Sequence, residues 1–198
     1  MRVSTRVDRS APAGRQRRSN AVGVFFSVKA WKHIAAAIGM LGFDTVEQDD
    51  IDKDSTVRMS PTVSVRNGSR ISIGPGAEIG QGCHLWAGDT VGRIDIGSHA
   101  LFAPNVFVTS SNYRFDDGDG PVMHQGREER DVWIGDNTWI GAGVVVVAGA
   151  RIGHGAIIAA GAVVTGDIPD FAVAAGIPAR VVRMRRSAPD DQGASASA

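Results

Sequence analysis

The chain of 198 residues is poor in several residue types, and each shortage narrows the possible functions. Cys83 is the one cysteine, so an internal disulfide framework is excluded and a reducing compartment is expected. Aromatic residues make up 6% of the chain, which predicts a core of aliphatic side chains. Lys plus Arg and Asp plus Glu both number 21, and this neutral balance argues against a general nucleic-acid binder.

The sequence also has no apolar run that suits a membrane-spanning segment. Its most apolar stretch, Ile140–Pro169, is interrupted by glycines and charges at regular intervals. Near the start of the chain, Lys29 and Lys32 interrupt the apolar stretch that begins at Ala21, which disfavours a secretory signal peptide. We therefore expect a cytoplasmic protein without membrane association.

Glycine, by contrast, is abundant, with 25 residues against a usual share of roughly 7%. Many glycines and alanines accompany aliphatic residues that recur at every sixth position. Twelve positions in three blocks carry this period: Ile73, Ile79 and Leu85; Ile96, Phe102 and Val108; and Ile134, Ile140, Val146, Ile152, Ile158 and Val164. The spacing of eleven between Leu85 and Ile96 marks one change of register.

A period of six fits a short strand followed by a turn and matches no helical period. Three such units make one triangular coil, and coils stack at the strand spacing of roughly 4.8 Å. The aliphatic side chains then point inward, where burial at roughly 25 cal/mol per Å² holds the coils together. A charge at Ile152 would be buried without a partner. The sequence thus predicts an all-β fold, a parallel β-helix of about four or five coils.

The remaining segments flank this β-helix. The first 20 residues carry six arginines and one aspartate and are expected to be disordered. The end coils would expose unpaired backbone groups, so we expect a covering segment at each end. The first should contain an amphipathic helix over residues 21–43, with a membrane-surface helix as the alternative. The expected boundaries are a disordered N-terminus at 1–20, a capping helical segment at 21–56, the β-helix at 57–169, a closing short helix or extension at 170–186 and a disordered tail at 187–198.

The period vanishes between residues 110 and 131. A long loop inside so regular an array is seldom without function, although a tolerated surface insertion is the alternative. The charged run Arg127–Asp131 in this loop is expected to be solvated.

Several motifs resemble those of the hexapeptide-repeat acyltransferases, in particular the branch that acetylates sugars and antibiotics. They are APNV at 103–106, SNYRFDD at 111–117, PVMHQG at 121–126, WIGDNTWIGAG at 133–143 and AAGIPARVVR at 174–183. The resemblance covers roughly residues 57–183. It implies a left-handed parallel β-helix with an ejected loop, a homotrimer, acetyl-CoA as co-substrate, no metal, and an active site between neighbouring subunits. It favours acetyl transfer to the hydroxyl of a polysaccharide or nucleotide sugar, with N-acetylation of an amino sugar as the alternative.

The family supplies its catalytic base as a histidine at the start of the loop, and here Tyr113 stands in that place. A phenol, with a pKa near 10, is a weaker base at neutral pH than an imidazole, with a pKa near 6.5. Four interpretations stay open. A cation such as Arg114 activates Tyr113, His124 replaces the missing base, the acceptor is an amine that depends less on a base, or the chain is a slow enzyme or a non-catalytic trimeric scaffold.

The resemblance also assigns residues to the acceptor. Asn105, in the APNV motif, would contribute to the acceptor site, although a turn-forming role is the default for a lone asparagine. Asn112, Arg114 and Asp116, which flank Tyr113, would bind the substrate.

The same resemblance places acetyl-CoA along the later coils. Small residues would let the cofactor lie against the backbone, a tryptophan would flank the groove unless it packs between subunits, and arginines would meet the CoA phosphates. These residues are Trp139, Gly141, Ala142, Ala159, Ala160, Thr165, Pro178, Ala179, Arg180 and Arg183, with Ala148 as a further candidate.

Zinc-dependent γ-type carbonic anhydrases share this helix but need converging histidines. Here His84, His99, His124 and His154 are separated by 15, 25 and 30 residues, and those in the repeats occupy different phases. We therefore expect no metal site, and we interpret all but His124 as surface turn residues.

Overall fold

The computed structural model describes residue 31 and residues 47–115 and 120–185. By its internal contacts the chain divides into residues 1–40 and 41–198, and every element named below lies in the second unit. The expected disordered tails at 1–20 and 187–198, nearly all of the expected helix at 21–43 and the candidate residue Asp116 lie outside the described residues.

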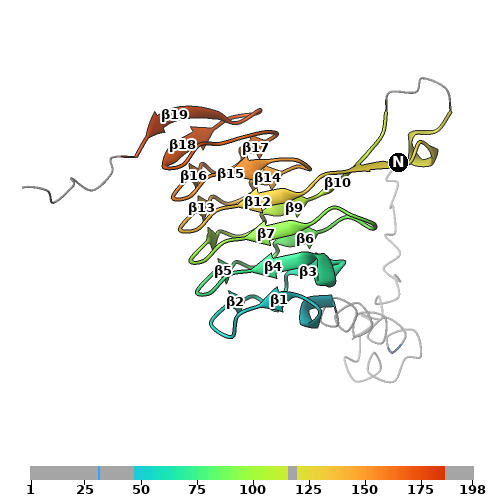
Figure 1. The fold of residues 1–198 in the computed structure, drawn as a ribbon, viewed down its shortest axis with the longest axis horizontal. Coiled ribbons are helices and arrows are strands. Elements are labelled where there is room, and N and C mark those ends of the chain that lie inside the picture. The colour runs from blue at the N-terminus through green and yellow to red at the C-terminus, as the bar shows by residue number, and fades with distance from the viewer. Residues whose placement is uncertain (1–30, 32–46, 116–119, 186–198) are drawn as a thin grey trace, which may run out of the picture. The chain divides into compact units, whose positions relative to one another are not determined.

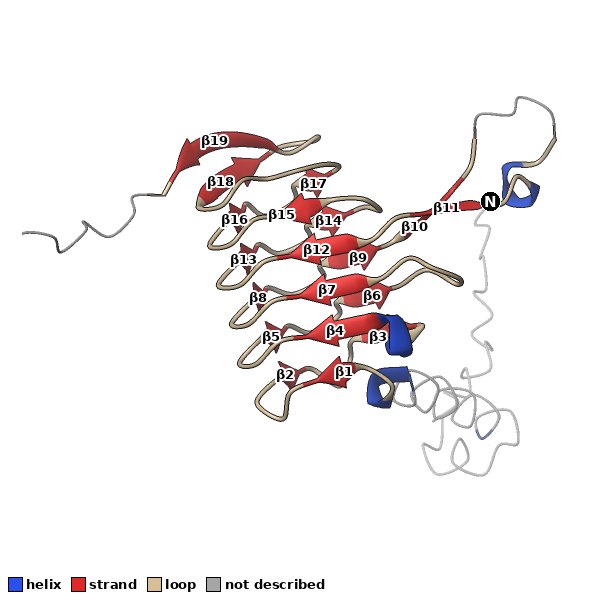
Figure 2. Cartoon of the chain, in the orientation of Figure 1, coloured by secondary structure: helices blue, strands red, loops and turns tan. Residues whose placement is uncertain are grey.

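Three sheets, parallel except for the last strand β19, form the walls of a β-helix (Figures 1 and 2). Sheet A contains β1 (Asp52–Lys53), β4 (Ile71–Ile73), β7 (Ile94–Ile96), β12 (Val132–Ile134) and β15 (Arg151–Ile152). Sheet B contains β2 (Arg58–Met59), β5 (Glu78–Ile79), β8 (Leu101–Phe102), β13 (Trp139–Ile140), β16 (Ile157–Ile158), β18 (Ala172–Ala175) and β19 (Arg180–Met184). Sheet C contains β3 (Ser64–Arg66), β6 (His84–Trp86), β9 (Phe107–Thr109), β14 (Val145–Val146) and β17 (Val163–Val164). The chain visits A, B and C in turn, so the predicted stacked coils are confirmed.

The core of the β-helix consists of the residues that carry the period of six. All twelve positions are at most 3% exposed. Their backbones are also in register from coil to coil, as in the pairs Ile134 with Ile152 and Ile140 with Ile158. Inward aliphatic stacking therefore holds the coils together, as the period predicts.

The ends of the β-helix differ in detail from the expected boundaries. The first strand, β1, begins at Asp52 and pairs with β4, so residues assigned to the capping segment already form part of sheet A. Just before it, residues 47–49 are helical, and the Gln48 side chain donates a 2.6 Å hydrogen bond to the Val63 carbonyl inside the first coil. At the other end the closing segment is extended, because β19 runs antiparallel to β18. None of the described helices has both the length and the hydrophobicity of a membrane-spanning segment.

The coils are unequal in length, and this inequality positions the candidate site. Asp52, Ser72, Asp95, Trp133 and Arg151 are successive register partners in sheet A. Their numbers show that successive coils take 20, 23, 38 and 18 residues. Since three hexapeptides make 18, the first three coils carry extra residues. All of these lie at one corner, where the chain passes from sheet C to sheet A.

Each of the three enlarged coils uses its extra residues differently. The first forms the 3-10 turn η1 (Gly68–Arg70), and the second forms a loop over residues 87–93. The third leaves the stack as a hairpin of β10 (Ser111–Tyr113) and β11 (Arg127–Glu129), which projects outward in Figure 2. The short helix η2 (Val122–His124) lies beyond the last pair of this hairpin.

Candidate active site

A pocket of about 340 Å³ lies at this corner, against the outer face of sheet C. Trp86 and Phe107 form an apolar wall, and their rings contact each other edge to face at 5.2 Å. The hairpin contributes Tyr113 and Arg127, and the preceding coils contribute Asp89 and Arg66. The three enlarged coils together therefore build one concave site with both aromatic and charged groups.

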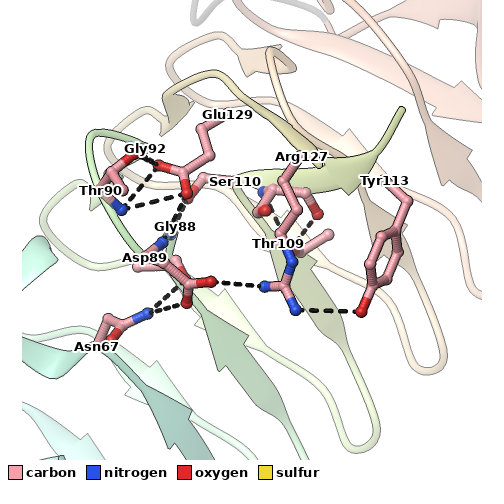
Figure 3. A network of polar contacts seen from close by, with 12 residues as sticks. Asn67, Gly88, Asp89, Thr90, Gly92, Thr109, Ser110, Tyr113, Arg127 and Glu129 are labelled. Carbon is pink, nitrogen blue, oxygen red and sulfur yellow. Dashed lines mark hydrogen bonds and ion pairs between the residues drawn. The ribbon is translucent and has the colours of Figure 1, made fainter. Parts of the chain in front are cut away.

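A chain of polar contacts crosses the pocket (Figure 3). The Arg127 guanidinium donates a 3.2 Å hydrogen bond to the hydroxyl oxygen of Tyr113 and forms a 2.9 Å ion pair with Asp89. The other carboxylate oxygen of Asp89 accepts a 3.1 Å hydrogen bond from the Asn67 side chain. Because Arg127 bonds to the hydroxyl oxygen of Tyr113, the hydroxyl hydrogen remains available to a ligand. The hydrogen bond to Tyr113 raises the pKa of Arg127, so this residue stays cationic.

The loop that carries Asp89 is held by a single carboxylate. Glu129 accepts hydrogen bonds from the backbone amides of residues 89–92 and from the Thr90 hydroxyl, at 2.7–3.2 Å. Burial of Glu129 acts to raise its pKa, but the hydrogen bonds from Gly92, Val91 and Thr90 outweigh it and lower the pKa to about 2. Glu129 is therefore ionised at neutral pH and fixes this loop against the hairpin.

Two glycines allow this close approach. A Cβ atom at Gly88 would collide with the carboxylate of Glu129, and one at Gly92 would lie 2.6 Å from the Ser110 carbonyl oxygen. On the other side, the buried Ser110 hydroxyl accepts a 2.8 Å hydrogen bond from the Gly88 amide. The loop and the root of the hairpin thus fit together without space for larger side chains.

One residue of the pocket has a buried hydroxyl without a partner among the described residues. The Oγ atom of Ser111 is buried and forms no hydrogen bond among the described residues, although Ser111 lines the pocket. A buried hydroxyl without a partner costs free energy, which a bound ligand with a polar group would recover.

The structure brings together only some of the acceptor residues expected from the sequence. Tyr113 and Asn112 line the pocket. Arg114 does not line it, and the cation beside the Tyr113 hydroxyl is Arg127 instead. His124 is exposed on η2 and does not line the pocket either. Asn105 lies at another corner, between sheets B and C, in a left-handed turn with φ of 61°.

Residues expected to bind acetyl-CoA gather mainly at the corner between sheets B and C. Gly141 and Ala142 form this corner in one coil, and Ala159 and Ala160 form it in the next. The coils touch closely there, since a Cβ atom at Gly141 would lie 2.6 Å from the Ala160 amide nitrogen. Pro178 and Ala179 follow one coil later, where the Ala179 amide donates a 2.7 Å hydrogen bond to the Val163 carbonyl.

The other expected cofactor residues are spread over adjoining surfaces. Trp139 is 51% exposed on sheet B, and Arg180 and Arg183 lie on the exposed strand β19. Thr165 follows β17 and lies at the corner between sheets C and A. The further candidate Ala148 is buried at 3% exposure. None of the expected cofactor residues lines the pocket beside Tyr113.

Two sequence-based interpretations need correction. The run Arg127–Asp131 is not simply solvated. Arg127 forms an ion pair with Asp89, and Glu129 accepts a hydrogen bond from the Gly92 amide. Asp131 accepts a 2.9 Å hydrogen bond from the Arg93 amide. His99 and His154 do lie in turns, but His84 lies in β6, where its ring contacts those of Trp86 and Phe107. In the described part of the chain, no group of three or more His, Cys, Asp or Glu residues is arranged to hold a metal ion.

Sequence reasoning missed Asn67, Asp89, Arg127 and Glu129 as site residues. A signal for three of them was present. The spacing of eleven between Leu85 and Ile96 marks the loop that carries Asp89, and the interruption after Val108 marks the hairpin that carries Arg127 and Glu129. Departures from the repeat therefore locate the site better than the repeat does.

The comparisons with known proteins agree with this fold. Residues 131–166 match the family model of the bacterial transferase hexapeptide, described as six repeats. A comparison with curated proteins finds no match for the chain. Among solved structures, a maltose O-acetyltransferase from Clostridium difficile is 28% identical, with a TM-score of 0.61, over 72% of this chain and 74% of that one.

Two more distant structures show the fold alone. One is a hexapeptide-repeat acetyltransferase from Vibrio cholerae in complex with acetyl coenzyme A, with 21% identity and a TM-score of 0.61 over 82% of this chain and 92% of that one. The other is AntD, an N-acyltransferase from Bacillus cereus in complex with dTDP-4-amino-4,6-dideoxyglucose and coenzyme A. It is 19% identical, with a TM-score of 0.57, over 72% of this chain and 89% of that one. The resemblance seen in the motifs is thus confirmed: the chain contains the hexapeptide repeat and shares the fold of the hexapeptide-repeat acetyltransferases.

Proposed function

We propose that the chain is an acetyl-CoA-dependent acetyltransferase that modifies a hydroxyl of a sugar or a sugar-containing acceptor. The observation that carries the proposal is the pocket where the β10–β11 hairpin leaves the coils. There the Tyr113 hydroxyl, at the position of the family's catalytic histidine, lies beside an aromatic wall and a guanidinium. Aromatic walls suit the apolar faces of sugar rings, and the surrounding polar groups suit their hydroxyls.

In the proposed reaction, the acceptor hydroxyl oxygen attacks the thioester carbonyl of acetyl-CoA. A C–O bond forms, the C–S bond breaks, and in net one proton moves from the acceptor hydroxyl to the CoA thiolate. The Tyr113 oxygen receives the acceptor proton as its own hydroxyl proton passes to the thiolate. The Arg127 guanidinium, whose nitrogen lies 3.2 Å from this oxygen, stabilises the partial negative charge that develops on it during the transfer. Asp89 keeps Arg127 in place for this role.

The Ser111 hydroxyl and the Asn112 side chain are proposed to bind and orient the acceptor. Both residues line the pocket, and the Ser111 Oγ atom has no partner among the described residues. Arg114 and Asp116 remain candidates from the resemblance, and Asn105 is proposed to act as a turn residue, because its backbone has a left-handed conformation.

The small residues at the corner between sheets B and C are proposed to receive acetyl-CoA. Since none of them lines the pocket in the same chain, one subunit does not by itself join cofactor and acceptor sites. In the homotrimer implied by the resemblance, the cofactor corner of one subunit would face the acceptor pocket of its neighbour, and the two sites would come together. We propose the cytoplasm as the location.

An acceptor screen tests the proposal. The full-length chain is incubated with acetyl-CoA and with sugars, sugar nucleotides, amino sugars and antibiotics, and released CoA is detected through its thiol. Acceptor-dependent release with a hydroxyl acceptor supports O-acetylation, and release only with amines supports the N-acetyltransferase alternative. No release, together with no acetyl-CoA binding in isothermal titration calorimetry, would favour a non-catalytic scaffold.

A further inference from the structure

Arg66 is the charged residue of the pocket that the proposed reaction does not use. Its guanidinium carbon lies 4.0 Å from the centre of the Trp86 ring, so the two groups stack. Among the described residues it takes part in no ion pair and its side chain donates no hydrogen bond. The nearby Glu47 carboxylate accepts the Asn67 amide but lies outside ion-pair distance of Arg66. The guanidinium N–H groups of Arg66 thus lie at the pocket wall without a hydrogen-bond acceptor among the described residues.

The charges in the pocket do not balance. Its lining contains two guanidinium groups, of Arg66 and Arg127, and one carboxylate, of Asp89. Asp89 is already paired with Arg127 at 2.9 Å. One positive charge therefore remains beside the cavity, held against the Trp86 ring and without an ion pair among the described residues.

A stacked guanidinium favours a particular kind of ligand. A guanidinium that lies over a ring, as Arg66 lies over Trp86, keeps its edge N–H groups free, and a planar carboxylate or a phosphate can accept two of them. Ser111, whose buried hydroxyl has no hydrogen-bond partner among the described residues, lines the same cavity. Trp86 and Phe107 line it as well, and their apolar surfaces suit a sugar ring.

We infer that the acceptor of this pocket is anionic and that Arg66 binds its carboxylate or phosphate group. This inference rests on the proposed function, because it names the class of acceptor for the same pocket. It goes beyond that function in excluding neutral sugars as the preferred acceptors.

The test compares matched acceptors that differ in charge. Glucose, glucuronate and glucose 1-phosphate are offered with acetyl-CoA to the wild type, to Arg66→Met and Arg66→Lys, and to Arg151→Gln. Arg151 is an exposed arginine on sheet A that does not line the pocket, and it controls for loss of a positive charge. The two anionic acceptors distinguish a carboxylate from a phosphate as the bound group.

We expect the wild type and Arg151→Gln to have a kcat/KM about tenfold or more higher for an anionic acceptor than for glucose. A hydrogen bond between charged groups stabilises a complex by this amount. Arg66→Met should remove most of this preference, and Arg66→Lys should keep part of it. A wild type that acetylates glucose as well as the anionic sugars, or an Arg66→Met variant with an unchanged preference, would overturn the inference.

Binding without turnover separates this inference from the proposed function. Saturation-transfer NMR of glucuronate and glucose 1-phosphate, recorded without acetyl-CoA, should show binding of at least one anion to the wild type and loss of that binding in Arg66→Met. Equal binding to both proteins, or no binding of either anion, contradicts the anionic acceptor. Anion binding without acetyl transfer to any acceptor would instead contradict the proposed function alone.

Discussion

The carboxylate of Glu129 accepts hydrogen bonds from both the backbone amide and the hydroxyl of Thr90, at 3.1 and 3.0 Å. Glu129 belongs to the hairpin and Thr90 to the loop of the preceding coil, 39 residues earlier. This contact joins two insertions that the hexapeptide repeat does not specify. It therefore determines the geometry of the pocket rather than that of the β-helix.

The first prediction concerns pH. The folded pKa of Glu129, about 2, lies below its ordinary value of 4.5, so its contribution to stability is complete above pH 4.5 and is lost as the pH falls toward 2. Glu129→Gln should lower the Tm by a few degrees at pH 7, and this difference should shrink between pH 4.5 and 2. Thermal unfolding at a series of pH values measures both effects.

Glu128→Gln provides the matched control for this experiment. Glu128 is an exposed neighbour that forms one ion pair among the described residues, with Arg130 at 3.3 Å, and such surface pairs contribute little to stability. The Tm of Glu128→Gln should equal that of the wild type at every pH in the series. A Tm difference between Glu129→Gln and the wild type that stays constant down to pH 2 would show that the charge of Glu129 is not what holds the loop.

A second prediction concerns the stacked core. Ile152 is fully buried and pairs with Ile134 in the coil before it. Ile152→Asp would bury an unpaired charge and should prevent folding, whereas Ile152→Val should cost about 0.5–1.5 kcal/mol. Urea denaturation followed by circular dichroism compares the free energies of unfolding. A stably folded Ile152→Asp protein would argue against inward stacking.

A third prediction addresses acetyl-CoA. Trp in place of the exposed Ala160, at the corner between sheets B and C, should raise the KM for acetyl-CoA several-fold by filling the proposed cofactor path. Gln81→Trp is the matched control, because Gln81 is exposed at the same corner three coils earlier. Equal KM values for the two variants would place the cofactor elsewhere.

A fourth prediction separates the two candidates for the proton acceptor. Tyr113→His introduces the family's residue in the pocket and should keep or raise kcat on a hydroxyl acceptor. His124→Ala should leave kcat unchanged, because His124 lies on η2 outside the pocket lining. A large loss of kcat in His124→Ala would return that residue to the mechanism, and a total loss in Tyr113→His would assign tyrosine a specific role.

The sequence predicts the fold well because each coil repeats the same local rule. An aliphatic residue at every sixth position, such as Ile140 or Ile158, can be assigned to the core from spacing alone. The resemblance also leads to Tyr113, which the structure places in the pocket.

The polar network could not be predicted in the same way. Asp89 and Arg127 are 38 residues apart, in two insertions that share no period with the repeat or with each other. Their contact depends on both insertions leaving the stack at the same corner, and only the three-dimensional register determines that. The mistaken expectation that the run from Arg127 to Asp131 is solvated has this origin.

The most direct test of the account is the kcat of Tyr113→Phe on the best acceptor from the screen, measured by acceptor-dependent CoA release. This substitution keeps the aromatic ring and removes only the hydroxyl that Arg127 contacts. If the Tyr113 hydroxyl carries the acceptor proton, kcat should fall about 10²-fold or more, the low end of what a general base contributes, and the Tm should stay close to that of the wild type. A variant that turns over at the wild-type rate would contradict a catalytic role for this pocket.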